Sequence, residues 1–156
     1  SRALSERLNL RMIDVERQIE DRFGDSMNNI RSIYGERRLK TVETDIMAEV
    51  ALNRNTLIRV SGSTLLNSGY LEELQHTGPV ICLVASLDSI LKRIHLTLGA
   101  RYHNPAERAA AIGVLQREWK IREHKGIHEF DATYIQEADL INNIAAFWRD
   151  IALRRG

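Results

Sequence analysis

Two carboxylates, Asp14 and Glu16, follow a short apolar run and are the first residues along the chain whose types and spacing could do chemistry. Acidic side chains at the carboxyl end of a strand are a common place for a metal or a general base in α/β folds. A local interpretation competes with this one, in which Asp14 caps a helix and Glu16 lies in its first turn. The sequence leaves both interpretations open.

Small residues, an arginine and two histidines supply weaker candidates. Residues 61–63 (Ser-Gly-Ser) follow a predicted strand, and small residues there would let a ligand approach backbone N–H groups, although a plain turn explains them equally well. Arg101 lies in a predicted exposed loop, where an arginine could clamp a phosphate.

His124 and His128 have the spacing of zinc ligands on a helix, but no third ligand has a suitable spacing, so we predict no zinc site. Cys82 lies in an apolar run and is predicted to be a packing residue, not a nucleophile.

These residues need elements to position them, and the chain alternates short apolar runs with helical patterns. The runs that predict strands are 10–13, 56–60, 79–84 and, as a last short strand, 132–136. The apolar spacing predicts helices over 2–8, 15–22, 27–33, 36–53, 70–75, 89–98, 105–123 and 138–153. Turns are predicted at 61–64 and an exposed loop at 98–105. The alternation predicts an α/β fold with a doubly wound parallel sheet flanked by helices.

Composition narrows the class of protein. The chain has 156 residues, 44% of them hydrophobic, which is the size of one domain with a real core. Lys and Arg number 22 against 21 acidic residues, so no net charge attracts nucleic acid or an anionic membrane. The single cysteine excludes an internal disulfide and favours a reducing compartment. No apolar run is long enough for a membrane span. We therefore expect a cytoplasmic protein without nucleic-acid or membrane partners. We also expect a monomer.

A series of motifs runs through the first half of the chain. In order they are RALSERL (2–8), DVERQIE (14–20), GDSM (24–27), GERRLKTVE (35–43) and SGS (61–63). They resemble the shikimate kinase family, small P-loop kinases with the patterns R-A-L-A-x-x-L, D-x-D-x-x-I-E, G-x-S-I, G-E-x-x-F-R-x-x-E and G-G-G. The family's next apolar strand and L-x-x-R helix fall on 80–84 and 90–93, so the resemblance covers essentially the whole chain.

The resemblance implies a P-loop kinase fold with a short lid loop and ATP-dependent phosphorylation of a small hydroxylated, carboxylate-bearing metabolite. ATP and Mg²⁺ would be the cofactors. Asp14 would help hold Mg²⁺ through water. Glu16 would bind the acceptor hydroxyl and act as the base, and residues 61–63 (Ser61, Gly62 and Ser63) would line the acceptor pocket. Lys40 and Arg122 would bind the acceptor carboxylate.

The same resemblance assigns roles to two further arginines. Arg93 would pack on the adenine ring, and Arg101 would close over the transferring phosphate. Arg117 is the alternative to Arg122, because the register after Arg117 is open. A lid arginine suits phosphoryl transfer, which needs positioning and charge neutralisation more than covalent help.

The chain also departs from the family pattern on the acceptor side. Glu16 stands for an aspartate and is one methylene longer, and Lys40 stands for an arginine and cannot form a bidentate fork. Ser-Gly-Ser replaces Gly-Gly-Gly, and Arg-Tyr-His-Asn from Arg101 replaces R-P-L-L. These departures leave the identity of the acceptor open.

The chain contains no G-x-x-x-x-G-K-[ST] phosphate loop. Since that loop and the strand before it lie centrally in the family's sheet, we expect the natural protein to have residues upstream of Ser1. The domain is then a single shikimate kinase-like unit over 1–156 whose first strand and phosphate loop are missing. Two alternatives to a kinase remain. One is a non-catalytic ligand-binding or regulatory domain on the same scaffold, and the other is a helper that binds a protein through its C-terminal helix.

Overall fold

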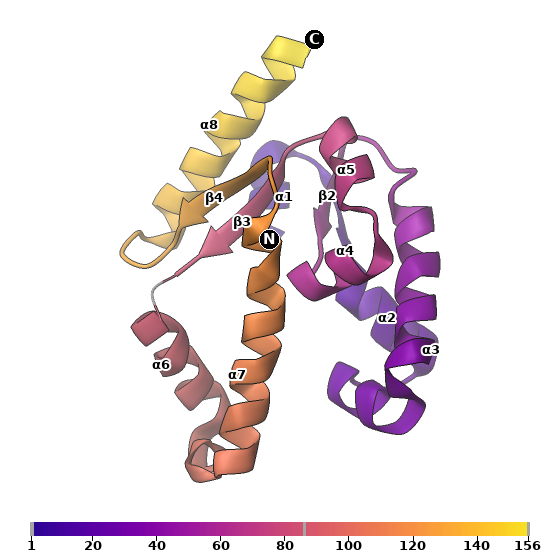
Figure 1. Ribbon diagram of the computed structural model, residues 1–156. Coiled ribbons are helices and arrows are strands. Elements are labelled where there is room, and N and C mark those ends of the chain that lie inside the picture. Colours follow the sequence, from indigo (N-terminus) through magenta and orange to yellow (C-terminus); the bar gives the residue numbers. More distant parts are fainter. Residues whose placement is uncertain (1, 86, 156) are drawn as a thin grey trace. The chain divides into compact units, whose positions relative to one another are not determined.

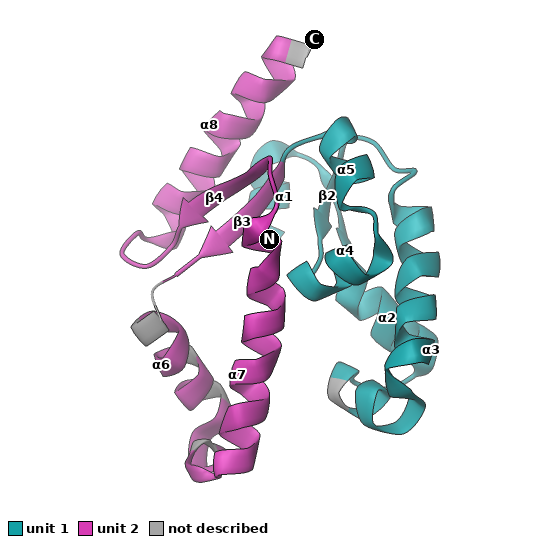
Figure 2. Cartoon of the chain, viewed as in Figure 1, with its two compact units in different colours: residues 1–79 teal, residues 80–156 magenta. Residues whose placement is uncertain are grey.

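The computed structural model describes residues 2–85 and 87–155, which form two compact units, residues 1–79 and 80–156 (Figure 2). The first unit contains α1 (Arg2–Leu8), β1 (Arg11–Asp14), α2 (Val15–Phe23), α3 (Met27–Val50), β2 (Thr56–Arg59), α4 (Gly62–Ser68) and α5 (Leu71–Thr77). The second contains β3 (Val80–Val84), α6 (Leu87–Leu98), η1 (Gly99–His103), α7 (Pro105–Trp119), η2 (Lys120–Glu123), β4 (Ile127–Asp131) and α8 (Glu137–Arg155) (Figure 1).

In the first unit β1 and β2 run parallel, in a register that pairs Arg11 with Thr56 and Asp14 with Arg59. Parallel strands need a crossover connection, and α2 and α3 supply it. The turn from β1 into α2 is fixed by Asp14, whose side chain accepts a hydrogen bond from the backbone N–H of Arg17. This arrangement brings the carboxyl ends of the two strands side by side.

The long helix α3 is two helices joined at Gly35, whose backbone is non-helical with φ of 78° and ψ of 162°. Ser26 caps its first segment by accepting from the N–H of Asn29. Glycine suits this position because a Cβ disfavours positive φ. The prediction of separate helices on either side of Gly35 is confirmed.

The buried side chains of the first unit come mainly from α2 and α3. From α2 and α3 they are Val15, Ile19, Met27, Ile30, Leu39, Ile46, Met47 and Val50. Ile13 of β1, Leu65 of α4, and Leu71 and Leu74 of α5 are buried as well. The helix predicted over 36–53 ends at Val50, and Leu52 beyond it is 79% exposed.

In the second unit β3 and β4 are parallel, with Val80 opposite Ile127. Helix α8 covers β4 through Phe147, whose ring lies 4.7 Å from that of His128 and 5.4 Å from that of Phe130. Helices α6 and α7 are joined by the 3₁₀ turn η1, and Asn104 caps α7 by accepting from two backbone N–H groups.

The structure corrects three predicted elements. Residues 61–64 do not form a plain turn, because Ser61 caps α4 and the helix begins at Gly62. The predicted loop over 98–105 is exposed along most of its length but contains the 3₁₀ helix η1. The last strand is Ile127–Asp131, not 132–136.

The α/β class with parallel strands is confirmed. The four described strands form two separate two-stranded sheets, β1–β2 and β3–β4. Although the run 79–84 is continuously apolar, Leu83 of β3 is 56% exposed. None of the described helices combines the length and the apolar character that crossing a membrane would require.

Candidate functional site

The carboxyl ends of β1 and β2 bring Asp14 and Arg59 together. Arg59 donates from Nη1 to Oδ2 of Asp14 over 2.8 Å, and Oδ1 of Asp14 accepts from the N–H of Arg17 over 3.2 Å. The Asp14 side chain is 20% exposed and that of Arg59 is 56% exposed. Asp14 is thus both a helix cap and half of an ion pair, so the capping interpretation of this residue is confirmed.

Glu16 lies two residues further on, in the first turn of α2. It is exposed, whereas its neighbours Val15 and Ile19 are fully buried. An exposed carboxylate beside the carboxyl edge of parallel strands is open to a ligand.

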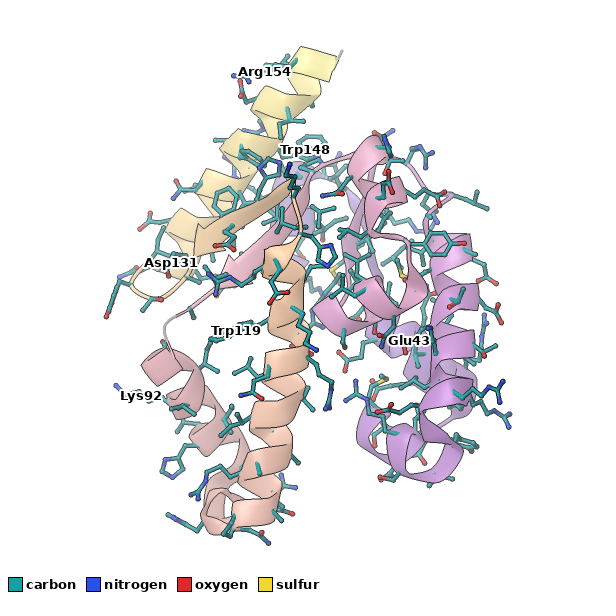
Figure 3. All side chains as sticks on the ribbon, in the orientation of Figure 1. Glu43, Lys92, Trp119, Asp131, Trp148 and Arg154 are labelled. Carbon is teal, nitrogen blue, oxygen red and sulfur yellow. The ribbon has the colours of Figure 1, made fainter. Side chains whose placement is uncertain are left out.

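A buried hydrogen-bonded network lies behind this edge. Ser61 donates to Oγ1 of Thr64 over 3.0 Å and accepts from the Thr64 N–H over 3.2 Å. The Thr64 hydroxyl in turn donates to the carboxylate of Glu43. Glu43 lies on α3 and is labelled in Figure 3. Glu43 and Thr64 are each only 3% exposed. Burial raises the pKa of Glu43, and the bond from Thr64 and the charges of Arg31 and Lys40 partly offset that rise.

The remaining predicted acceptor residues of this unit lie around the network. Ser63 is within 3.4 Å of Ser61 through their hydroxyl oxygens, and Gly62 is the first residue of α4. Lys40 is exposed on the second segment of α3, three residues before Glu43. The carboxyl edge of β1 and β2 therefore gathers Asp14 and residues 61–63, with Lys40 and Glu43 on the helix behind.

In the second unit the predicted lid arginine, Arg101, is exposed on η1. The ring of His103 on the same turn lies 5.8 Å from that of His95 on α6. Arg93 belongs to α6, but the placement of its side chain lies outside the described part of the chain. Their predicted roles stay predictions.

Arg122, the predicted carboxylate-binding arginine, has a partner within the chain. Its Nε and Nη2 donate to the two carboxylate oxygens of Glu129 on β4 over 2.9 and 3.2 Å, and its guanidinium lies 5.6 Å from the ring of Trp119. The hydrogen bond from Arg122 lowers the pKa of the Glu129 carboxyl. The fork that would hold a substrate carboxylate is thus occupied by a protein carboxylate. Arg117, the alternative, is exposed near the end of α7.

The described histidine and cysteine side chains give no support for a metal site or a cysteine nucleophile. Within them no group of three or more His, Cys, Asp and Glu side chains could hold a metal. His124 follows η2 and His128 lies on β4, so the two are not on one helix. Burial and the charge of Glu129 raise the pKa of Cys82, which keeps it protonated.

A magnesium ion prefers carboxylate oxygens, so Asp14 has the right chemistry for the predicted role. Its surroundings oppose that role. Both oxygens already accept hydrogen bonds, and the Arg59 guanidinium repels a second cation at Oδ2. As long as this ion pair is made, Asp14 does not fit a magnesium ion.

Sequence reasoning missed Arg59 and gave Glu43 little weight. An arginine within a short, otherwise apolar strand was the available signal for Arg59, because a charged residue there needs a partner. Nothing local marked Glu43 as buried. Its burial follows from α4 packing on α3, which a turn prediction for residues 61–64 excluded.

Comparison with known proteins identifies relatives of this chain by sequence. The sequence model described as shikimate kinase matches residues 1–146. A shikimate kinase of Caldicellulosiruptor bescii is 30% identical over 91 residues, which are 58% of this chain and 53% of that one. One from Thermus thermophilus is 32% identical over 115 residues, 71% of this chain and 62% of that one. The chain thus spans between about half and three fifths of the length of these relatives.

Solved structures agree in fold. Shikimate kinase from Bacteroides thetaiotaomicron superposes with a TM-score of 0.74 at 19% identity, covering 97% of this chain and 88% of that one. The enzyme from Acinetobacter baumannii, solved in complex with shikimate, has a TM-score of 0.62 at 19% identity and covers 99% of this chain and 84% of its own. With its motifs, its parallel strands and a family match over nearly its whole length, the chain belongs to the shikimate kinase family.

Proposed function

We propose that the protein is an ATP-dependent kinase that phosphorylates a hydroxyl group of a small, carboxylate-bearing metabolite. The observation that carries this proposal is the placement of Asp14, Glu16 and residues 61–63 at the carboxyl edge of β1 and β2 in a chain of this family. Ligands of open α/β sheets bind outside the carboxyl ends of the strands.

Glu16 is the proposed base. Its carboxylate would accept the proton of the acceptor hydroxyl as that oxygen forms a bond to the γ-phosphorus of ATP and the bond from phosphorus to the bridging oxygen of ADP breaks. The products are a phosphate monoester, ADP and a proton first held by Glu16. The exposure of this carboxylate in the first turn of α2 supports the role, because a substrate can reach it.

The other proposed roles concern binding. Lys40 would attract the acceptor carboxylate as a point charge, and residues 61–63 would line the acceptor pocket. Arg122 would be a second carboxylate-binding group if the substrate displaces Glu129, with Arg117 as the alternative. Arg93 would stack on the adenine ring and Arg101 would neutralise charge on the transferring phosphate.

The acceptor is proposed only as a chemical class. A relative in this family is known in complex with shikimate, a hydroxylated carboxylate. In this chain Glu16 is one methylene longer than the aspartate of the motif, and Lys40 cannot form the bidentate contact of an arginine. Ser61 and Ser63 add hydroxyl groups to the proposed acceptor pocket. An acceptor of different shape is therefore compatible with the same reaction. Magnesium would accompany the nucleotide phosphates, as is usual for phosphoryl transfer. The comparisons lend no support to a non-catalytic alternative.

The test is turnover by the natural protein. It is incubated with ATP, Mg²⁺ and either shikimate or a panel of cyclic and linear hydroxy acids, with ADP followed by a coupled assay and the phosphate ester by ³¹P NMR. We expect acceptor-dependent ADP formation, and a fall in kcat of about 10²-fold to 10⁴-fold in Glu16→Gln, the range for loss of a general base.

Asp21→Asn is the matched control, because Asp21 is an exposed acid on the same helix to which no role is given. Its kcat should match that of the wild type. ATP binding without phosphorylation of any acceptor would contradict the proposal and would favour a ligand-binding domain.

A further inference from the structure

The ion pair between Asp14 and Arg59 is the feature that the proposed reaction leaves unused. Arg59 takes no part in the roles proposed above. Its guanidinium nevertheless holds, over 2.8 Å, the carboxylate to which the family resemblance assigns a magnesium ion. A cation supplied by the chain therefore already binds the carboxylate that is expected to help hold the metal.

The sheet builds this pair. Asp14 and Arg59 are register partners at the last residues of β1 and β2, so their side chains leave the same face of the sheet at neighbouring positions. Asp14 is largely covered and is held from its other oxygen by Arg17. Its carboxylate is therefore fixed, and a ligand approaching it would meet the guanidinium at Oδ2.

Arg59, by contrast, is the more exposed partner. More than half of its side chain is exposed, so the guanidinium can leave Asp14 for solvent without being buried unpaired. A divalent cation and a guanidinium repel each other at a shared carboxylate oxygen. The two cations therefore compete, and the fixed carboxylate binds one of them at a time.

We propose that Arg59 is a built-in counter-ion of Asp14, and that a divalent cation reaches this carboxylate only when the guanidinium swings away. Arg59 is then a positioning residue that sets how much divalent cation the site requires. This inference deepens the proposed function, on which it rests for the presence of a metal, but its test needs no turnover.

The experiment titrates the natural protein with Mn²⁺ alone, a probe for the same oxygen ligands as Mg²⁺, and follows the free ion by its EPR signal. Arg59→Gln removes the charge and should bind Mn²⁺ about fivefold tighter than the wild type, the factor that corresponds to breaking a partly exposed ion pair. Arg59→Lys keeps the charge and should stay close to the wild-type affinity.

Asp14→Asn supplies the matched control, because its amide oxygen can still accept from the Arg17 N–H and preserve the cap. In the Arg59→Gln background this change should erase the gain in Mn²⁺ affinity, whereas in the wild type it should change little. Unfolding midpoints of all variants establish that each is folded.

The proposal is overturned if Arg59→Gln binds Mn²⁺ no tighter than the wild type, or if the gain survives Asp14→Asn. Either result would also leave the kinase assay unaffected, since that assay measures phosphorylation. Conversely, a gain that depends on Asp14 in a protein without kinase activity would support the ion competition and contradict the proposed function.

Discussion

Each of the two units contains an ion pair that engages a predicted ligand-binding residue, and the two pairs are built differently. Asp14 in the first unit is mostly covered and also caps α2, and the residues behind it, Glu43 and Thr64, are buried. Arg122 and Glu129 in the second unit form a better, two-bonded pair, yet both side chains remain more than a third exposed. The hydrogen-bond geometry of the two pairs therefore does not predict which pair contributes more to stability, whereas the burial of their side chains does.

The difference between the two pairs determines whether a candidate ligand-binding residue also contributes to stability. Replacing a residue of the first unit's edge removes a charge and a structural contact together. Replacing Arg122 or Glu129 removes a contact that water can substitute. Changes in the first unit should therefore alter the free energy of unfolding, and changes at the exposed pair should not.

Thr64→Val should give the largest effect. Valine is similar in size but leaves the buried Glu43 carboxylate without its hydroxyl donor, so the free energy of unfolding should fall by about 1–3 kcal/mol. Urea denaturation measures it. Thr64→Ser, which keeps the hydroxyl, should cost less than the valine variant, and equal losses would mean that the methyl group matters instead.

Asp14→Ala should come next. It removes the cap on the Arg17 N–H, worth about 0.5–2 kcal/mol, and leaves Arg59 without its partner. Asp14→Asn keeps a capping oxygen and should lose less in the same denaturation experiment. If alanine and asparagine were equally harmful, the ion pair and not the cap would carry the stability.

Glu43→Gln should change how stability depends on pH. Because burial raises the pKa of Glu43 in the folded state, the folded protein binds this proton more tightly than the unfolded chain, whose ordinary value is 4.5. Wild-type stability from this residue is therefore lost as pH rises from about 4.5 through the raised value. The glutamine variant lacks this loss, so its stability relative to the wild type should rise over that window. Parallel pH profiles would refute the expectation.

Glu129→Gln should have the smallest effect. Its pKa is lowered by Arg122, so any contribution to stability exists above the ordinary value of 4.5 and is lost as pH falls through the lowered one. Because the pair is exposed, we expect an unfolding midpoint close to that of the wild type at neutral pH, and an even smaller difference at high salt. A large loss would show that exposure is a poor guide to these two pairs.

Patterns of apolar residues predicted most of the framework. The strands at 10–13, 56–60 and 79–84 and the break at Gly35 were visible because periodicity and glycine act locally. The last strand was misplaced by five residues, because IHEFD is mostly polar and lacks the regular alternation of a strand. Pairing with β3, a long-range contact, stabilises it instead.

The candidate site was predictable in its residue types but not in its pairings. Asp14 and residues 61–63 were found from order and spacing. The partners that restrain these candidates, Arg59 for Asp14 and Glu129 for Arg122, come from neighbouring elements. A local pattern contains no record of a contact between residues that lie 45 positions apart in the chain, as Asp14 and Arg59 do.

The interruption of α3 at Gly35 also divides that helix into two units of local opening. Helical hydrogen bonding cannot run unbroken through a residue with φ of 78° and ψ of 162°, so unwinding of residues 27–34 need not spread to 36–50. The second segment contains four buried apolar side chains, Leu39, Ile46, Met47 and Val50. The first contains two, Met27 and Ile30, and exposes Ile33 and Tyr34 near its end. Amide hydrogens of the first segment should therefore exchange with solvent at a lower free-energy cost, which makes residues 27–34 a foldon boundary inside what a ribbon draws as one helix.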